Sequence, residues 1–334
     1  MTESVKPQED FVVGLDHLVD RSLPRWDIPS AARARLINVS ENATYLVEDG
    51  VGFKSILRVH RPNYHTRRAI ECELAWSTAL GREGGVATPA LFTGRDGEAI
   101  QTVSSGVSGE ERHMVMFAFV DGSEPDPNQN LIQPFKQLGR MAALTHDHSM
   151  RWHKPSPFVR PYWVEETVFG DSAIWGDWRA APRVDWEIRA ALERLETAVV
   201  SRLRAFGKQP ERFGLIHADM RLANLLIDKA EPRLIDFDDC GFGWFLYDFA
   251  ASISFMEDHP QVPELKHAWV EGYRTKRDLP DADEREIDTF VMFRRMALLA
   301  WIGTHSEVET ARQLAPTFAE GTAKLAEAYL IKLV

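Results

Sequence analysis

With 334 residues, 44% of them hydrophobic, the chain is long enough to bury a sizeable core as one large domain or two smaller lobes. Its formal net charge of −11 argues against a nucleic-acid-binding surface, which requires clustered Lys and Arg, and is compatible with a cationic or zwitterionic substrate. The two cysteines, Cys72 and Cys240, lie far apart and lack metal-ligand spacing, which argues against a disulfide framework and a structural zinc site.

The first ten residues carry acids and proline, where a secretory signal peptide would have a basic start and an apolar run. No uninterrupted apolar stretch is long enough to cross a bilayer. We therefore expect a cytoplasmic protein that does not bind membranes.

The first third of the sequence predicts an antiparallel sheet. Short runs of strand-forming residues alternate with turns such as Glu48-Asp49-Gly50, and they predict strands at 35–39, 44–47, 55–59, 97–103 and 113–120. Between the third and fourth of these strands, apolar residues at helical spacing predict a helix over 66–80, followed by the glycine-bearing stretch 81–85.

From residue 130 onward the pattern changes to long amphipathic helices, predicted at 131–147, 185–206, 244–256, 264–276, 283–301 and 307–333. The segments that interrupt them as predicted strands are 213–216, 225–227 and 233–237. The economical architecture is an α+β fold of two lobes, with a small sheet-based lobe at 1–121 and a larger, mostly helical lobe at 122–334.

The chemistry is concentrated between residues 213 and 250. An apolar strand there leads into His217-Ala218-Asp219, Asn224 follows five residues after Asp219, and a second apolar strand ends in Asp236. Transfer of a γ-phosphoryl group needs a carboxylate that receives the proton of the acceptor, and it needs ligands that hold Mg²⁺ against the phosphates. Asp219 is therefore the candidate catalytic base, while the amide of Asn224 and the carboxylate of Asp236 are hard oxygen ligands for Mg²⁺. We expect His217 to brace the backbone of the loop and to take no part in acid–base work.

The H-x-D-x-x-x-x-N loop, followed by an apolar strand that ends in Ile-Asp, resembles the catalytic and metal-binding loops of the aminoglycoside phosphotransferase and choline kinase superfamily. The continuation IDFDDCGFGWFLYDFA, with Asp248, resembles the branch of type II homoserine kinases, hydroxylysine kinases and the bacterial stress-response Ser/Thr kinase. The resemblance runs from about Val39 to the last helices, and 216–248 is its specific part. It implies a protein-kinase-like two-lobed fold, the use of ATP and Mg²⁺, and a bracing role for Asp248 on the catalytic loop.

The nucleotide side departs from the protein-kinase pattern. The turn at 39–44 contains no glycine, but it resembles the Glu-Asn turn of this superfamily. The resemblance implies that the side chains of Ser40 and Asn42 can bind phosphate. Without the downstream motif, the same residues would indicate a simple hairpin turn. The register of the third strand sets Arg58 where a lysine usually pairs the α- and β-phosphates, and Lys54 is the alternative. Arginine keeps the charge but differs in reach, which leaves open how fully it replaces the lysine.

An acid from the following helix should brace this cation, and we choose Glu73 over Glu71. The adenine is expected against the strand that links the lobes, with the backbone of Met116, Phe117 and Phe119 as candidate contacts. Periodicity alone cannot separate these positions from ordinary core.

The expected reaction is transfer of the γ-phosphoryl group of ATP, with Mg²⁺, to a hydroxyl of a small, amine-bearing acceptor. Asp238 and Asp239 follow the metal ligand closely, and tryptophans such as Trp163 and Trp175 are available for cation–π contacts. A stress-response type of Ser/Thr protein kinase and a catalytically degenerate nucleotide-binding scaffold remain as alternatives. No motif identifies the acceptor, the preference for ATP over GTP, or the oligomeric state.

Overall fold

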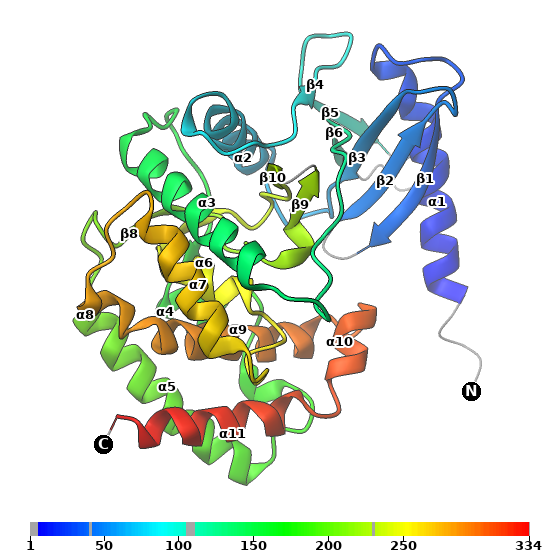
Figure 1. The fold of residues 1–334 in the computed structure, drawn as a ribbon. Helices are drawn as coiled ribbons and strands as arrows, with labels where there is room; N and C mark the ends of the chain where they lie inside the picture. The colour runs from blue at the N-terminus through cyan, green and yellow to red at the C-terminus, as the bar shows by residue number, and fades with distance from the viewer. Residues whose placement is uncertain (1–5, 40–41, 105–110, 229–230, 334) are drawn as a thin grey trace. The chain divides into compact units, whose positions relative to one another are not determined.

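The computed structural model describes residues 6–39, 42–104, 111–228 and 231–333, with side chains from residue 14 onward in these ranges. The chain forms two units (Figure 1). The first comprises residues 1–78, 88–121 and 157–159, and the second comprises residues 79–87, 122–156 and 160–334.

A six-stranded antiparallel sheet forms the centre of the first unit. Its strands are β1 (Arg33–Val39), β2 (Ala43–Glu48), β3 (Lys54–Val59), β4 (Leu91–Phe92), β5 (Ile100–Ser104) and β6 (Glu111–Ala118). They are arranged in the order β1-β2-β3-β6-β4, and β5 also pairs with β6. All five strands predicted for this region are confirmed, and only the two-residue strand β4 was not predicted.

The alternation of side chains along β6 divides the core of the first unit into two clusters. Met114 and Met116 pack with residues of α1 (Lys6–Ser22), whereas Val115, on the opposite face, packs with residues of α2 (Arg67–Ala79). The helices contribute Leu15, Leu18 and Val19 to the first cluster and Ile70 and Leu74 to the second. The helix predicted at 66–80 is confirmed as α2, and α1 was not predicted.

Helices dominate the second unit. The longer ones are α3 (Ile132–Arg151), α5 (Trp186–Phe206), α7 (Val262–Arg274), α9 (Ile287–Thr304) and α11 (Phe318–Ile331). The shorter ones are α4 (Glu165–Val168), α6 (Tyr247–Ser252), α8 (Asp281–Glu284) and α10 (Glu309–Leu314). The fold class is α+β, as predicted.

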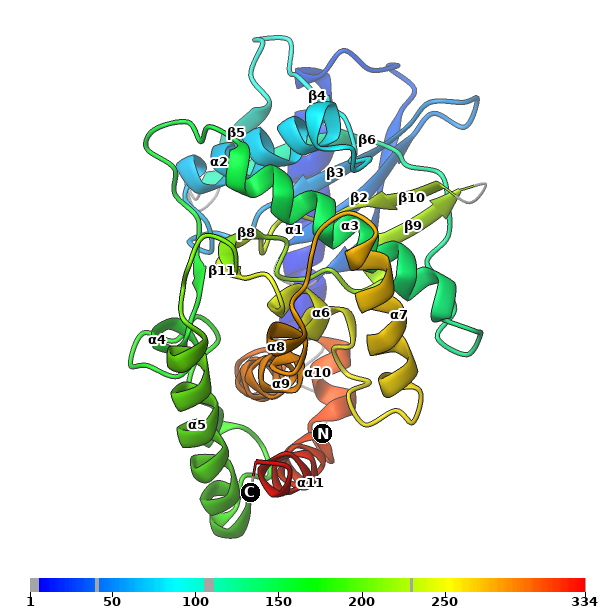
Figure 2. The same cartoon turned by 60° about the vertical axis from the view of Figure 1, so that its left-hand side comes forward.

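Two glycines let α3 and α7 approach each other closely (Figure 2). A Cβ atom at Gly139 of α3 would lie 1.9 Å from the carbonyl oxygen of Trp269, and one at Gly272 of α7 would lie 1.9 Å from that of Lys136. Any side chain at either position would force the helices apart. This crossing fixes α3, which carries a histidine that supports the catalytic loop.

Short strands deliver the candidate catalytic residues in the second unit. They are β7 (Tyr162–Trp163), β8 (Phe213–Ile216), β9 (Leu225–Asp228), β10 (Glu231–Leu234) and β11 (Gly241–Trp244). β9 and β10 pair with each other, and β11 pairs with β7 and β8. β8 ends directly before His217, and β10 ends two residues before Asp236. The strands predicted at 213–216 and 225–227 are confirmed, and the third ends at Leu234, earlier than predicted.

The helices predicted at 131–147, 185–206 and 264–276 are confirmed as α3, α5 and α7, with ends shifted by up to four residues, and the other three differ more. The one predicted at 244–256 is the short helix α6, because Trp244 is the last residue of β11, opposite Phe213. The one predicted at 307–333 is divided into α10 and α11, and Pro316, which has no N–H to donate, lies in the break. The one predicted at 283–301 is α9, which begins at Ile287 after the separate short helix α8. Among the described residues, no helix combines the length and the apolar character needed to cross a membrane.

Candidate active site

The backbone is held in an unusual conformation at two points of the candidate site. Ala218 has a φ of +65° and Asp236 a φ of +59°, in the left-handed region that residues with a Cβ atom seldom adopt. Such a conformation costs of order 1–3 kcal/mol and persists only where the surroundings hold it. Ala218 directly precedes Asp219, and Asp236 is itself the candidate metal ligand. The backbone is therefore constrained at the residues predicted to carry the chemistry.

The buried carboxylate of Asp248 in α6 holds the catalytic loop. Its Oδ1 accepts a hydrogen bond from the N–H of Ala218 at 2.8 Å, and its Oδ2 accepts one from the N–H of His217 at 3.2 Å. Oδ2 also lies 2.9 Å from Nε2 of His146 in α3, whose Nδ1 lies 3.0 Å from the hydroxyl of Tyr273 in α7. Burial lowers the pKa of His146 and outweighs the opposing effect of Asp248, so the ring is neutral near pH 7. The bracing role expected for Asp248 is confirmed.

His217 is a structural residue of the loop. The N–H of Asp219 donates to its Nδ1 at 3.3 Å, so the ring proton is on Nε2, which donates to the carbonyl oxygen of Ile235 at 3.1 Å. Both ring nitrogens are therefore used inside the protein, and the ring connects the catalytic loop with the segment before Asp236.

The side chain of Asp219 is fixed by three donors and remains 15% exposed. Its Oδ1 accepts from Nη2 of Arg294 in α9 at 2.9 Å. Its Oδ2 accepts from Nε of Arg221 at 3.0 Å and from Nδ2 of Asn224 at 2.9 Å. Burial alone would raise the pKa of Asp219, but the positive charges of Arg221 and Arg294 outweigh it and hold the pKa below its usual range. Asp219 is therefore ionised at neutral pH.

Asn224 and Asp236, the candidate metal ligands, are tied to each other through the backbone. The amide nitrogen of Asn224 donates to both the carbonyl oxygen and Oδ2 of Asp219, which leaves its Oδ1 as the atom that can bind a metal. The N–H of Ile235, directly before Asp236, donates to the carbonyl oxygen of Asn224 at 3.0 Å. Mg²⁺ commonly takes one or two such protein oxygens and completes its shell with water and phosphate. The described ranges contain no group of three His, Cys, Asp or Glu residues placed to hold a metal.

In the first unit, Arg58 of β3 and Glu73 of α2 form a buried ion pair. Nη2 of Arg58 lies 2.5 Å from Oε1 of Glu73, and the two side chains are only 6% and 2% exposed. The guanidinium also lies 5.1 Å from the ring centre of Phe117, and the ammonium of Lys54 lies 5.3 Å from the ring centre of Phe119. Lys54 and Arg58 are four positions apart on one strand, so both cations and both rings share one face of the sheet.

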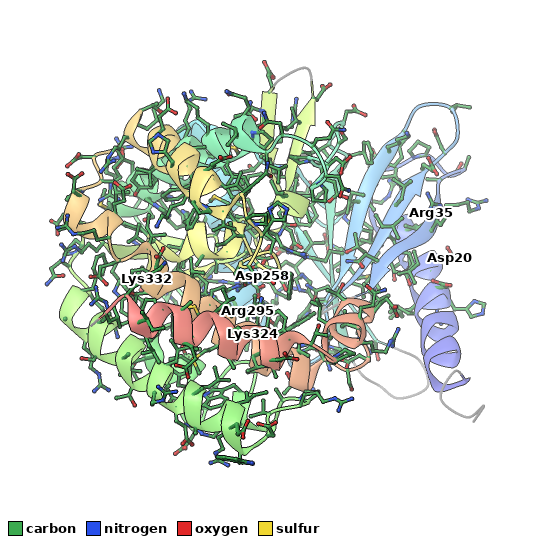
Figure 3. All side chains as sticks on the ribbon, turned by 60° about the horizontal axis from the view of Figure 1, so that its bottom comes forward. Asp20, Arg35, Asp258, Arg295, Lys324 and Lys332 are labelled. Atoms are coloured by element: carbon green, nitrogen blue, oxygen red, sulfur yellow. The ribbon has the colours of Figure 1, made fainter. Side chains whose placement is uncertain are left out.

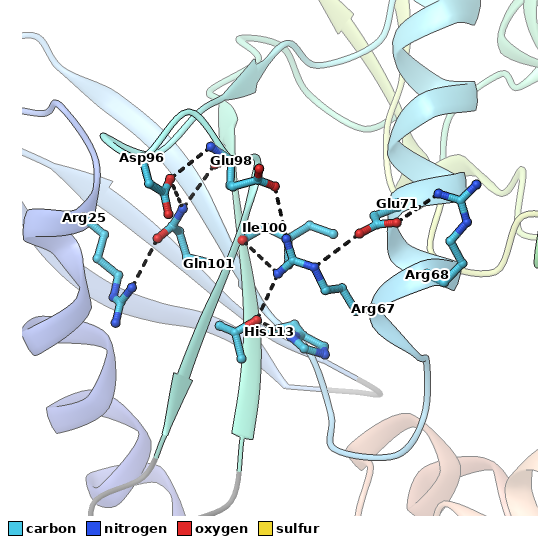
Figure 4. A network of polar contacts seen from close by, with 10 residues as sticks. Arg25, Arg67, Arg68, Glu71, Asp96, Glu98, Ile100, Gln101 and His113 are labelled. Atoms are coloured by element: carbon cyan, nitrogen blue, oxygen red, sulfur yellow. Dashed lines mark hydrogen bonds and ion pairs between the residues drawn. The ribbon is translucent and has the colours of Figure 1, made fainter. Parts of the chain in front are cut away.

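The alternative bracing acid, Glu71, is engaged elsewhere (Figure 4). Its two carboxylate oxygens lie 3.2 Å from Nε of Arg67 and 3.0 Å from Nη1 of Arg68, both on its own helix. Arg67 also donates to Thr102 and to the backbone of Ile100 in β5. Glu71 thus belongs to a network that attaches α2 to the sheet, and the choice of Glu73 as the partner of Arg58 is confirmed.

Ser40, Asn42 and Met116 are the other residues that were predicted to contact the nucleotide. Ser40 lies outside the described residues. Oδ1 of Asn42 accepts from the N–H of Arg61 at 3.1 Å, which connects the first turn to the end of β3. The side chain of Met116 is buried in the core, and the residue pairs with Leu57 of β3 on one side and Phe92 of β4 on the other, so it lies inside the sheet.

Sequence reasoning missed Arg221, Arg294, His146 and Tyr273. Three of these come from distant helices, and no local spacing relates them to the loop. One signal was available: Arg294 and Arg295 are adjacent charges inside the otherwise apolar segment 290–302, and buried charges almost always have partners.

An aspartate delivered by a strand, with an amide and a second carboxylate close after it, is the arrangement of phosphotransferases with a protein-kinase-like fold. The comparisons with known proteins give the same class. The chain belongs to the phosphotransferase enzyme family, whose model matches residues 34–286. It is therefore an enzyme, a phosphotransferase of the kinase class with an alcohol group as acceptor.

Three relatives illustrate this membership. A structure described as the microcompartment-associated aminopropanol kinase is 43% identical, with a TM-score of 0.87 over 95% of this chain and 98% of that one. The amicoumacin kinase hAmiN, solved with AMP-PNP, Ca²⁺ and Ami, is 19% identical, with a TM-score of 0.74 over 97% and 96% of the two chains. Amicoumacin kinase of Bacillus subtilis (strain 168) is 22% identical over 236 residues, which are 68% of this chain and 67% of that protein. The likeness to hAmiN concerns the fold, which is the one expected from the sequence.

Proposed function

We propose that this enzyme transfers the γ-phosphoryl group of ATP, with Mg²⁺, to the hydroxyl group of a small amino alcohol. The observation that carries the proposal is the state of Asp219, an ionised and partly exposed carboxylate held at the end of β8 by three donors. A positioned carboxylate beside metal-binding oxygens is what phosphoryl transfer to an alcohol requires.

In the proposed reaction, the acceptor oxygen forms a bond to the γ-phosphorus while the bond from that phosphorus to the oxygen of ADP breaks. The proton of the acceptor hydroxyl goes to Asp219, which also orients the hydroxyl for in-line attack. Mg²⁺, when bound by Oδ1 of Asn224 and the carboxylate of Asp236, would neutralise charge on the phosphates. In the first unit, Arg58 would contact the α- and β-phosphates, with Glu73 fixing its orientation.

The surroundings of Asp219 support an acceptor that carries an amine. Burial raises the pKa of Tyr247, and Tyr247 and Asp219 outweigh the effect of burial and raise the pKa of Arg294; the nearby carboxylate of Asp239 makes a smaller contribution to both. Trp163 lies 4.8 Å from Trp175 and 5.9 Å from Tyr247, measured between ring centres, and its Nε1 donates to the carbonyl oxygen of Asp239. Trp163, Trp175 and Tyr247 are buried, and the guanidinium of Arg294 lies over the rings of Trp175 and Tyr247, so these rings do not form the cation–π lining that was expected. The half-buried carboxylate of Asp239 is the group here that favours an ammonium. The 43% identity with an aminopropanol kinase supports an amino alcohol of that size.

The test begins with calorimetric titration of ATP in the presence and absence of Mg²⁺. ADP release is then measured with 1-amino-2-propanol, ethanolamine, choline, homoserine, hydroxylysine, an aminoglycoside and a generic protein substrate, with Asp219→Asn as the control for transfer. We expect Mg²⁺-dependent binding and turnover with one of the small amino alcohols. Turnover with the protein substrate alone would replace this proposal with a Ser/Thr protein kinase, and absence of ATP binding would replace it with a degenerate scaffold.

A further inference from the structure

Arg294 is buried in α9, and its guanidinium contacts four acceptors. Nε donates to the hydroxyl of Ser254 at 3.2 Å, and Nη1 donates to the hydroxyl of Tyr247 at 3.2 Å and to the carbonyl oxygen of Ala218 at 3.3 Å. Nη2 donates to Oδ1 of Asp219 at 2.9 Å. Four of the five N–H donors of an arginine are thus used, which fixes the plane of the group.

Arg294 and Asp248 hold the same strained peptide from opposite ends. Asp248 accepts the N–H of Ala218, and Arg294 donates to the carbonyl oxygen of that residue, whose φ is +65°. Because Arg294 also contacts the Asp219 carboxylate, one guanidinium fixes both the backbone before the catalytic residue and the orientation of its side chain.

The donors around Asp219 leave its two carboxylate oxygens unequal. A carboxylate offers about four lone-pair directions, two on each oxygen. Oδ2 receives both Arg221 and Asn224, whereas Oδ1 receives Arg294 alone among the described residues of the chain. Oδ1 therefore has a direction left for an incoming hydroxyl, and it is the oxygen that Arg294 contacts.

We propose that Arg294 is a positioning residue for phosphoryl transfer, which orients Asp219 so that its Oδ1 receives the acceptor hydroxyl. This inference rests on the proposed function, because it assigns Arg294 a task only if Asp219 receives that proton. Arg294 acts through Asp219 and does not need to touch the substrate. Its contribution belongs to the transfer step and not to nucleotide binding.

The neighbouring residue Arg295 offers a matched control. It lies on the same helix and is similarly buried, and Figure 3 shows it close to Lys324 of α11. Its Nη1 lies 2.6 Å from Oε2 of Glu257, and its Nε donates to Thr322 at 2.9 Å. A substitution at Arg295 therefore measures the effect on turnover of losing a buried arginine contact in α9, while the contacts of Asp219 stay the same.

The experiment compares Arg294→Lys, Arg294→Met, Arg295→Lys and Asp219→Asn. Turnover is measured with the responsive amino alcohol and expressed per ATP-binding site, the number of sites being taken from calorimetry, so that misfolded protein does not count. We expect Arg294→Met to lower kcat about 10²-fold, the scale of a misplaced catalytic group. Arg294→Lys should recover part of that loss, and the Kd for ATP should be unchanged in both variants. Arg295→Lys should keep the wild-type kcat per site.

The decisive readout is the double variant Arg294→Met with Asp219→Asn, measured in single turnover with radiolabelled ATP. If Arg294 acts through Asp219, adding Arg294→Met to Asp219→Asn should change the rate by less than about twofold, the usual error of additivity. Equal losses in both backgrounds, or equal losses for Arg294→Lys and Arg295→Lys, would overturn the inference. A wild-type rate for Asp219→Asn alone would instead overturn the proposed function.

Discussion

Asp248→Asn tests the brace on which the catalytic loop depends. The substitution keeps the shape of the side chain, removes its charge and turns one of its two oxygens into an N–H donor. With the remaining oxygen facing His217 and His146, the new amide group faces the N–H of Ala218, now donor against donor. A hydrogen bond to a charged group contributes about 1.5–3 kcal/mol, so loss of one and weakening of two should lower the free energy of unfolding by about 3–5 kcal/mol.

The free energy is measured by urea unfolding followed by tryptophan fluorescence, with linear extrapolation to water. Asp258→Asn, the same change at an exposed position, should alter it by no more than about 0.5 kcal/mol. Because Ala218 would lose its support, turnover of the folded variant should also fall. A loss of less than about 1 kcal/mol, or an unchanged kcat, would show that the loop does not depend on Asp248.

Gly139→Ala should lower the free energy of unfolding by about 1–3 kcal/mol, because its Cβ would lie 1.9 Å from a carbonyl oxygen of α7. Gly14→Ala in α1 is the control and should not destabilise the protein, because no atom lies within 4 Å of the added Cβ. Urea unfolding of the two variants in parallel measures both effects. Burial lowers the pKa of His146, so the ring stays neutral in the folded state while the unfolded chain takes up a proton below about pH 6.5, and stability is lost as the pH falls. Between pH 7.5 and 5.5 this loss should be smaller in His146→Gln, by at most about 1.4 kcal/mol, and an equal loss would refute the role of the ring. Glu73→Gln should weaken Mg²⁺-dependent ATP binding and lower the free energy of unfolding by about 3 kcal/mol, because Arg58 loses a carboxylate at 2.5 Å. An unchanged affinity for ATP, measured by calorimetry, would exclude the Arg58–Glu73 pair from nucleotide binding.

Much of the fold was predictable because it is encoded locally. Runs of strand-forming residues between turns predicted five strands of the first unit, and helical spacing predicted α2. The loop around Asp219 was found because strand, polar residues and strand follow one another within a short segment. The predicted helix bounds were wrong where pairing with a distant strand determines the structure. Trp244 is an example, because it pairs with Phe213 in a strand although the residues around it have helical spacing.

The support of the site was less predictable, because it depends on residues that meet only in the folded chain. Arg294 is separated from Asp219 by 75 positions, and His146 from Asp248 by 102. The spacing of residues along the sequence does not predict such contacts. A charged residue in an apolar helix shows only that a buried partner exists, and identifying that partner required the structure.

The most direct test of the central claim is identification of the product by phosphorus NMR after incubation of the enzyme with Mg²⁺, ATP and 1-amino-2-propanol. We expect ADP and a phosphate ester on the hydroxyl carbon, formed by the wild type at a rate that falls roughly 10²- to 10⁴-fold in Asp219→Asn, the scale of lost general-base help. An ester formed equally fast by Asp219→Asn, or phosphate on the amine with the hydroxyl left free, would contradict it.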